Sequence, residues 1–319
     1  MARFVCVALA MLLGLAGAQA ETYPSRPIKF LVSFPPGGSA DVVVRAIQPT
    51  VEKHLGQPLV IENRGGAGGV IGVDAVAKAP PDGYTIGLGA AGALAVNVSL
   101  QQKMPYDPIK DLAPVSLLSA IPFILIAPSG LSANSLQDAI ALAKQKPDTS
   151  IGHGGNGTAM HLTAALFNQM AQVSTTLVPY RGSAPVASDV LAGHVPFGVT
   201  DIPSAISLIK DGKIKAIAVT STRRYALLPD LPTFAESGLP GFEAVGWFGV
   251  VAPAGTPPEI IARLNAAVVA ALKDPEVRER VLAIGADPAP TTAAEFGDFI
   301  KSETVKWARV IALAGAKAN

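Results

Sequence analysis

The chain reads Phe34-Pro35-Pro36-Gly37-Gly38-Ser39-Ala40-Asp41 between an apolar run, Ile28 to Ser33, and a segment of helical periodicity, Val42 to Leu55. This order predicts a strand, a loop and a helix. Ser39 is a good helix N-cap, and the two glycines let the backbone approach a ligand without a Cβ in the way. Free amide N–H groups and the positive end of the helix dipole favour a carboxylate or phosphate. The alternative is a capped helix start in a tight turn, with no ligand.

Two later stretches repeat this pattern of glycine-rich backbone ahead of a helix. The first reads Gly152-His153-Gly154-Gly155-Asn156-Gly157-Thr158 and precedes a helical segment, Ala159 to Met170. The second reads Tyr180-Arg181-Gly182-Ser183 and precedes a segment from Pro185 to Leu191. Three such loops predict a binding protein in which loops of two lobes close on one ligand.

Short apolar runs alternate with helical segments along the chain, which predicts an α/β fold with mostly parallel sheets. Ligands of such folds bind beyond the carboxyl ends of the strands. Two long apolar runs, Val115 to Pro128 and Val245 to Pro253, end in similar turns and are predicted to cross between the lobes. We therefore expect a first lobe at residues 21–122 plus 246–319 and a second lobe at residues 123–245.

The first 20 residues have the pattern of a secretory signal peptide. Arg3 precedes an apolar run from Phe4 to Ala16, and Ala18-Gln19-Ala20 forms a cleavage site. The run is shorter than the roughly 20 residues that a membrane-spanning helix needs. We therefore expect a soluble, exported mature chain that begins near Glu21. Cys6, the only cysteine, leaves with the signal, which excludes disulfides and cysteine catalysis.

Charge and composition exclude several partners. The chain has 25 Lys and Arg residues against 24 Asp and Glu, so the loss of Arg3 leaves equal numbers. A neutral protein lacks the excess positive charge that binds nucleic acid or an anionic membrane. A chain of 319 residues that is 50% apolar can bury a large core, and two lobes are the expected arrangement. We expect a monomer without a cofactor.

Motifs spread over the whole mature chain resemble one known family. Five of them are Asn63-Arg64-Gly65-Gly66-Ala67-Gly68-Gly69, Pro81-Asp82-Gly83-Tyr84-Thr85, Gly157-Thr158-Ala159-Met160-His161-Leu162, Pro179-Tyr180-Arg181-Gly182-Ser183-Ala184-Pro185 and Ala252-Pro253-Ala254-Gly255-Thr256-Pro257. In this order and spacing the chain resembles the Bug family, the extracytoplasmic solute receptors of tripartite tricarboxylate transporter systems. The resemblance implies a two-lobed periplasmic binding protein fold, type II-like, with two crossing strands. It also implies a small carboxylate or amino acid as ligand and integral membrane transporter subunits as partners.

The resemblance further implies which residues bind the ligand. In the first lobe they are Phe34, Gly37, Gly38, Ser39, Asp41, Ala90, Ala91 and Asn97. In the second lobe they are Gly157, Thr158, His161, Arg181, Gly182 and Ser183. Two more candidates depart from the family pattern. His153 stands where the family usually has a serine, which would place an imidazole at the cleft wall, and Asp201 follows by one residue a position that is usually aspartate.

Several of these residues also have a structural interpretation. Asp41 could meet an amino or hydroxyl group of the ligand, or could complement the dipole of its own helix. His161 could brace the loop three residues before it. Arg181 could pair with a carboxylate or face solvent. His153 and His161 have no third metal ligand near them in the sequence, so we expect no metal site.

Three functions from different classes then remain: a solute receptor that feeds a membrane carrier, a periplasmic ligand sensor that presents its closed form to a receptor kinase, and an exported enzyme. The chain shows no phosphate-binding or dinucleotide motif and no nucleophile with its base, which disfavours the enzyme. The receptor and the sensor share one binding event and differ in their partner.

Overall fold

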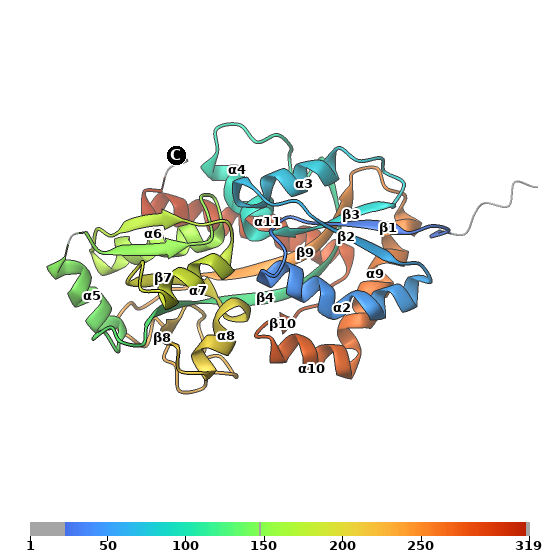
Figure 1. Cartoon of the computed structure of the whole chain (residues 1–319). Helices are drawn as coiled ribbons and strands as arrows, with labels where there is room; N and C mark the ends of the chain where they lie inside the picture. Colours follow the sequence, from blue (N-terminus) through green and yellow to red (C-terminus); the bar gives the residue numbers. More distant parts are fainter. Residues whose placement is uncertain (1–22, 147, 317–319) are drawn as a thin grey trace, which may run out of the picture.

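The computed structural model describes residues 23–146 and 148–316, which form an α/β protein of two lobes (Figure 1). The predicted signal peptide, residues 1–20, lies outside the described residues. One ten-stranded sheet runs through both lobes in the order β2-β1-β3-β9-β4-β7-β5-β6, and β8 and β10 also pair with β4. The predicted α/β class is confirmed.

The two lobes share one long strand. The first lobe holds β1 (Ile28–Val32), β2 (Leu59–Asn63), β3 (Thr85–Ala90), β9 (Val245–Pro253) and β10 (Asp287–Pro288). The second holds β5 (Ser150–His153), β6 (Thr176–Pro179), β7 (Phe197–Asp201) and β8 (Ile214–Val219). Residues 112–122 of β4 (Leu112–Pro128) pair with β9, and residues 123–128 pair with β7 and β8. The lobe boundaries at residues 122 and 245 stay a prediction.

Strand direction differs from the expectation of mostly parallel sheets. The pairs β1–β2, β1–β3, β5–β6 and β5–β7 are parallel. All pairs made by β4 or β9 within the described sheet are antiparallel. Strands β4 and β9 are the two long apolar runs of the sequence, and they lie side by side in the middle of the sheet in opposite directions. Because β4 is covered on both faces, it is apolar almost throughout instead of alternating.

The helices surround the sheet in both lobes. They are α2 (Ser39–Leu55), α3 (Val70–Ala77), α4 (Asn97–Leu100), α5 (Leu136–Gln145), α6 (Ala159–Ala171), α7 (Ser183–Leu191), α8 (Ile202–Lys210), α9 (Pro258–Lys273), α10 (Pro275–Ala283) and α11 (Ala293–Ala314), with a short 3-10 turn η2 (Ala67–Gly69) and a π-turn η3 (Gly92–Val96). In the part of the chain that the structure describes, no helix has the length and apolar character needed to span a membrane.

Helix α2 follows the opening loop and begins at Ser39, which is therefore its first residue and not the predicted N-cap. Gly38 is its N-cap in an extended conformation, and the helix ends where Gly56 takes a left-handed conformation with φ 78°. Its buried face is built from residues at helical spacing, among them Val43 and Ile47, and packs against α9. The loop before α2 is thereby held at the carboxyl end of β1.

Helix α11 connects the two lobes from behind the sheet (Figure 1). It packs against α6 of the second lobe and against β4 and η3. Its buried face carries Phe296 and Trp307, both fully buried. No motif of the sequence analysis predicted α10 or α11.

Candidate ligand-binding site

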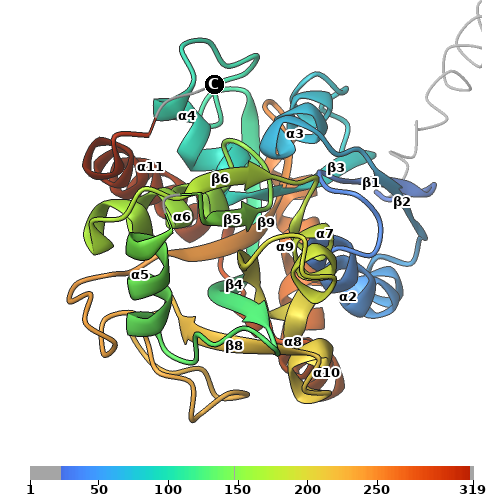
Figure 2. The same ribbon diagram turned by 60° about the vertical axis from the view of Figure 1, so that its left-hand side comes forward.

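A cavity of about 430 Å³ lies between the lobes. It is lined by the loops that follow β1, β3 and β6 and by the end of β7. In Figure 2, α7 of the second lobe lies next to α2 of the first. The cavity is therefore at the carboxyl ends of strands from both lobes, where α/β folds bind their ligands.

Four helices begin at this cavity: α2, α6, α7 and α8. Thr158 and Asp201 cap α6 and α8 with their own side chains, which accept N–H groups of the first turn. Gly38 and Gly182 cap α2 and α7 and offer no side-chain acceptor. Helices α2 and α7 thus present first-turn N–H groups without a side-chain cap, together with the positive ends of their dipoles.

Ten of the sixteen residues predicted to bind ligand line this cavity. They are Phe34, Gly38, Ser39, Ala90, Ala91, Thr158, Arg181, Gly182, Ser183 and Asp201. The three glycine-rich loops are thus brought together from distant parts of the chain. Ligand contact by any of these residues stays a prediction.

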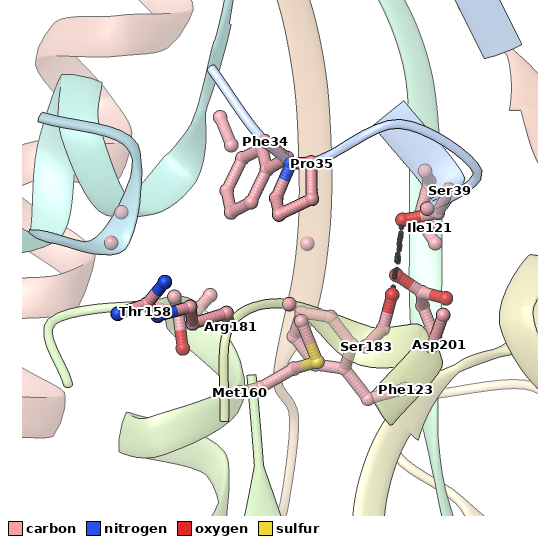
Figure 3. Close-up of a pocket in the computed structure, with 18 of the residues that line it drawn as sticks. Phe34, Pro35, Ser39, Ile121, Phe123, Thr158, Met160, Arg181, Ser183 and Asp201 are labelled. Atoms are coloured by element: carbon pink, nitrogen blue, oxygen red, sulfur yellow. Dashed lines mark hydrogen bonds between the residues drawn. The ribbon is translucent and has the colours of Figure 1, made fainter. Parts of the chain in front are cut away.

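The right-hand end of the cavity in Figure 3 carries a polar cluster from both lobes. Ser39 Oγ donates to Asp201 Oδ2 at 2.5 Å and lies 3.4 Å from Ser183 Oγ. Ser183 Oγ is 2.6 Å from Ser204 Oγ. Burial raises the pKa of Asp201, and hydrogen bonds from Ser39, Ser204 and Ser183 oppose this rise. The cluster joins α2 of the first lobe to α7 and α8 of the second.

Arg181 lies at the opposite end of the same view, where its side chain extends toward Thr158 (Figure 3). The residue is exposed and lines the cavity. Among the described residues, no hydrogen bond or ion pair engages its guanidinium group. This cation is therefore available to a bound carboxylate.

The cavity between these two ends has an apolar wall that sequence reasoning missed. Its large side chains are Phe123, Met160, Trp247 and Phe248, beside the predicted Phe34. Three of the four missed residues stand on the two strands that were predicted to cross between the lobes. A crossing strand must pass the cleft, so its aromatic side chains could have been identified as cavity residues from that prediction.

The structure places the other six predicted residues outside this cavity: Gly37, Asp41, Asn97, His153, Gly157 and His161. Asp41 braces the opening loop, since it accepts hydrogen bonds from Gly37 N at 3.0 Å, Asn63 Nδ2 at 3.0 Å and Arg45 Nε at 2.9 Å. Burial alone would raise the pKa of Asp41, but these hydrogen bonds outweigh it and keep the pKa below its usual value. The geometry favours the structural interpretation of Asp41.

Asn97 and Gly157 form a second contact between the lobes. Asn97 Nδ2 donates to Gly157 O and to Gly92 O, each at 2.9 Å. With His161 they line a separate hollow of about 780 Å³. These residues therefore hold the glycine loops together on the side away from the main cavity.

His153 is fully buried and stacks on His161, with ring centroids 4.8 Å apart. Its Nδ1 accepts the Gly155 N–H at 3.3 Å, and its Nε2 has no partner in the described part of the chain. Burial, with a smaller contribution from His161, lowers the pKa of His153 to about 3. The ring is thus neutral near physiological pH and supplies no charge to the cavity.

This buried histidine predicts that the protein loses stability in mild acid. The unfolded chain takes up a proton below pH about 6.5, whereas folded His153 does so only near pH 3. Between these values stability falls as pH falls, by about 2 kcal/mol from pH 7.5 to 5. Burial also lowers the pKa of His161, which acts in the same direction.

Urea denaturation at both pH values measures this loss. His153→Gln keeps an acceptor and cannot titrate, so it should reduce the pH dependence by about 2 kcal/mol. The matched control is His54→Gln, because His54 is exposed. A His153→Gln protein with the pH dependence of the original chain would contradict the assignment.

The residues that the structure describes include no group of three or more His, Cys, Asp or Glu side chains that could hold a metal ion. The chemistry of the cavity is instead that of helix N-termini, serine hydroxyls, one arginine, the two carboxylates of Asp189 and Asp201, and an apolar wall. This set can bind an organic anion by hydrogen bonds and dipoles.

The two-lobed fold with a cavity at facing helix N-termini defines a solute-binding protein of the periplasmic type. A family model described as the tripartite tricarboxylate transporter family receptor matches residues 43–315, and the chain belongs to this family. Protein BugT of Bordetella pertussis (strain Tohama I) is 41% identical over 304 residues, which cover 95% of this chain and 93% of BugT. The predicted resemblance to the Bug family is confirmed.

Solved structures of similar proteins share the whole fold. R. palustris Rpa4515 with adipate has a TM-score of 0.89 and 36% identity, and the match covers 92% of this chain and 99% of that chain. MatC from Rhodopseudomonas palustris with bound malate has a TM-score of 0.86 and 35% identity, with 91% and 100% covered. The members of this family are solute-binding receptors.

Proposed function

We propose that the protein is a periplasmic receptor that captures a small organic carboxylate in the cavity between its lobes and delivers it to a tripartite tricarboxylate-type membrane transporter. One observation carries this proposal. The N-termini of α2 and α7 face one cavity from opposite lobes, and neither is closed by a side-chain cap. These N-termini, with that of α6 at Thr158, give the cavity a positive potential, which favours a ligand carboxylate at the end of the cavity that carries Arg181.

Two further features support an anionic ligand. Arg181 adds a cation that is not engaged by other described residues, and the apolar wall excludes water from the ligand. The related proteins solved with adipate and with malate carry small carboxylates. A binding protein uses such contacts for capture alone, so we infer no chemical step on the ligand.

We expect carboxylates to stabilise the protein against heat. A ligand at one hundred times its dissociation constant adds about 2.7 kcal/mol to the free energy of unfolding. A thermal-shift panel of organic acids, amino acids, sugars and cations at neutral pH measures this. Stabilisation by sugars or cations, with none by any carboxylate, would contradict the proposal.

Arg181→Gln should weaken carboxylate binding by about tenfold, because it removes a charge-assisted hydrogen-bond donor. The control is Arg223→Gln, which removes an exposed arginine that does not line the cavity. Calorimetric titration of both variants separates a contact at the site from a change in net charge. If the Arg181→Gln and Arg223→Gln proteins bound the carboxylate with equal affinity, Arg181 would face solvent and make no contact with the ligand.

The partner is inferred from the family description. Crosslinking of the ligand-loaded chain to membranes of its host should recover integral transporter subunits. Recovery of a receptor kinase in their place would favour the sensor, and the capture step would remain the same.

A further inference from the structure

We propose that Asp201 is an internal carboxylate that occupies the anion position at one end of the cavity, so that the ligand carries a carboxylate at one end only. The far end of the ligand would be uncharged, or would carry a hydroxyl or amino group that donates to Asp201. This inference rests on the proposed function and narrows its ligand class to monocarboxylates with an apolar body.

Asp201 lies where three helices begin. It caps α8 by accepting the Ser204 N–H at 3.1 Å. It also accepts the hydroxyl of Ser39, the first residue of α2, at 2.5 Å. Ser183, the first residue of α7, lies 3.4 Å from Ser39 through the two hydroxyl oxygens. Figure 3 shows these side chains converging at one end of the cavity.

The positive ends of three helix dipoles favour one negative charge at this point, and Asp201 supplies it. The residue is 1% exposed, and no ion pair to its carboxylate occurs among residues 23–146 and 148–316. Burial raises the pKa of Asp201 and so opposes its charge, whereas the hydrogen bonds from Ser39, Ser204 and Ser183 and the three helix N-termini favour the charged form. A second anion placed here would meet a buried like charge that water screens poorly.

The other end of the cavity has the opposite character. Arg181 and the N-terminus of α6 at Thr158 lie there (Figure 3). Between the ends stand apolar side chains, among them Phe34 and Met160. A ligand that matches this order has a carboxylate near Arg181 and an apolar body in the middle. Its far end can donate to the carboxylate of Asp201, which lines this end of the cavity.

Matched ligands test the inference on the unaltered chain. Hexanoate, 6-hydroxyhexanoate and adipate share a six-carbon chain, and benzoate, 4-hydroxybenzoate and terephthalate share a benzoate core. Calorimetric titration at pH 7.5 should show that at least one skeleton is bound, with the monocarboxylates at least about tenfold tighter than the dicarboxylate, because like charges repel strongly in a buried site.

Asp201→Asn should reverse this preference. Asparagine is also a good N-cap, so α8 keeps its first turn, and the anion position loses its built-in charge. The affinity for the dicarboxylate of the bound skeleton should rise by about tenfold or more. Asp211→Asn is the matched control, because Asp211 is exposed at the other end of α8 and the change in net charge is the same. If Asp201→Asn melts early, Asp201→Ser, which also caps a helix, takes its place.

The outcomes separate the inference from the proposed function. Equal or tighter binding of a dicarboxylate by the unaltered chain overturns the inference and leaves the receptor function intact. A preference for monocarboxylates that persists in both Asp201 variants overturns the role of Asp201. Binding of none of the six acids by the chain or its variants, with a clear response to sugars or cations, overturns the proposed function itself.

Discussion

Gly92→Val should weaken ligand binding by up to about a hundredfold while both lobes stay folded. A Cβ on Gly92 would lie 2.8 Å from Gly157 O, 3.0 Å from Gly68 O and 3.2 Å from Thr158 Cα. All three are backbone atoms, and two of them belong to the second lobe, so no side chain can move aside. Overpacking of this kind costs about 1–3 kcal/mol, and the upper end corresponds to about a hundredfold in affinity.

The loss should arise from the contact between the lobes. Gly92 begins η3 in the first lobe, and its carbonyl and that of Gly157 both accept from Asn97. A larger side chain would push the second-lobe loop away and hold the cavity open. Closure around the ligand would then be opposed, and because Gly92 also lines the cavity the added side chain would narrow the site itself.

Calorimetric titration with the carboxylate that gives the largest thermal shift measures the loss, and small-angle scattering should show a larger radius of gyration. Gly130→Val is the matched control, because a Cβ at Gly130 would meet no atom within 4 Å. An unchanged affinity in Gly92→Val would show that the bound form does not need this contact between the lobes.

Local patterns of the sequence predicted the parts of the site that depend on local chemistry. Glycine-rich backbone ahead of a helical segment predicted the starts of α2, α6 and α7, and these three starts meet at one cavity. A helix start is determined by residues within a few positions of each other, so one sequence contains the information. The anion-friendly character of the loops follows from the same local geometry.

Features that depend on distant pairing could not be predicted in this way. The close approach of Gly38 to a ligand stays a prediction, but the tight contact between the lobes is at Gly92, where a Cβ would lie 2.8 Å from Gly157 O, and no local pattern predicted it. His153 was expected at the cleft wall, but its ring packs inward on His161. The side to which a residue at the end of a strand points depends on the pleat and register of its sheet, and one sequence does not reveal that register.

Glu303→Leu should destabilise the protein by about 2–5 kcal/mol, because it leaves two buried indole N–H groups without an acceptor. Glu303 on α11 is 7% exposed, and its Oε2 accepts Trp247 Nε1 at 2.8 Å and Trp307 Nε1 at 2.9 Å. The two tryptophans are almost fully buried, so water cannot replace the carboxylate. A single oxygen thus joins β9 to α11, 56 residues apart in the sequence.

Trp247 also lines the cavity, so Glu303→Leu should also weaken ligand binding. Its ring is held from another side by Phe299, at 5.2 Å between ring centroids, and is therefore expected to tilt rather than leave its site. Glu303→Gln is the matched control: its amide oxygen can accept both indoles, so we expect a loss of less than about 1.5 kcal/mol. Urea denaturation followed by tryptophan fluorescence measures the free energy of unfolding of both variants. Calorimetric titration with the carboxylate that the protein binds measures the effect of the tilted ring on affinity. If Glu303→Gln were as unstable as Glu303→Leu, the charge of Glu303, which lies 3.7 Å from Lys306 Nζ, would matter more than its role as acceptor.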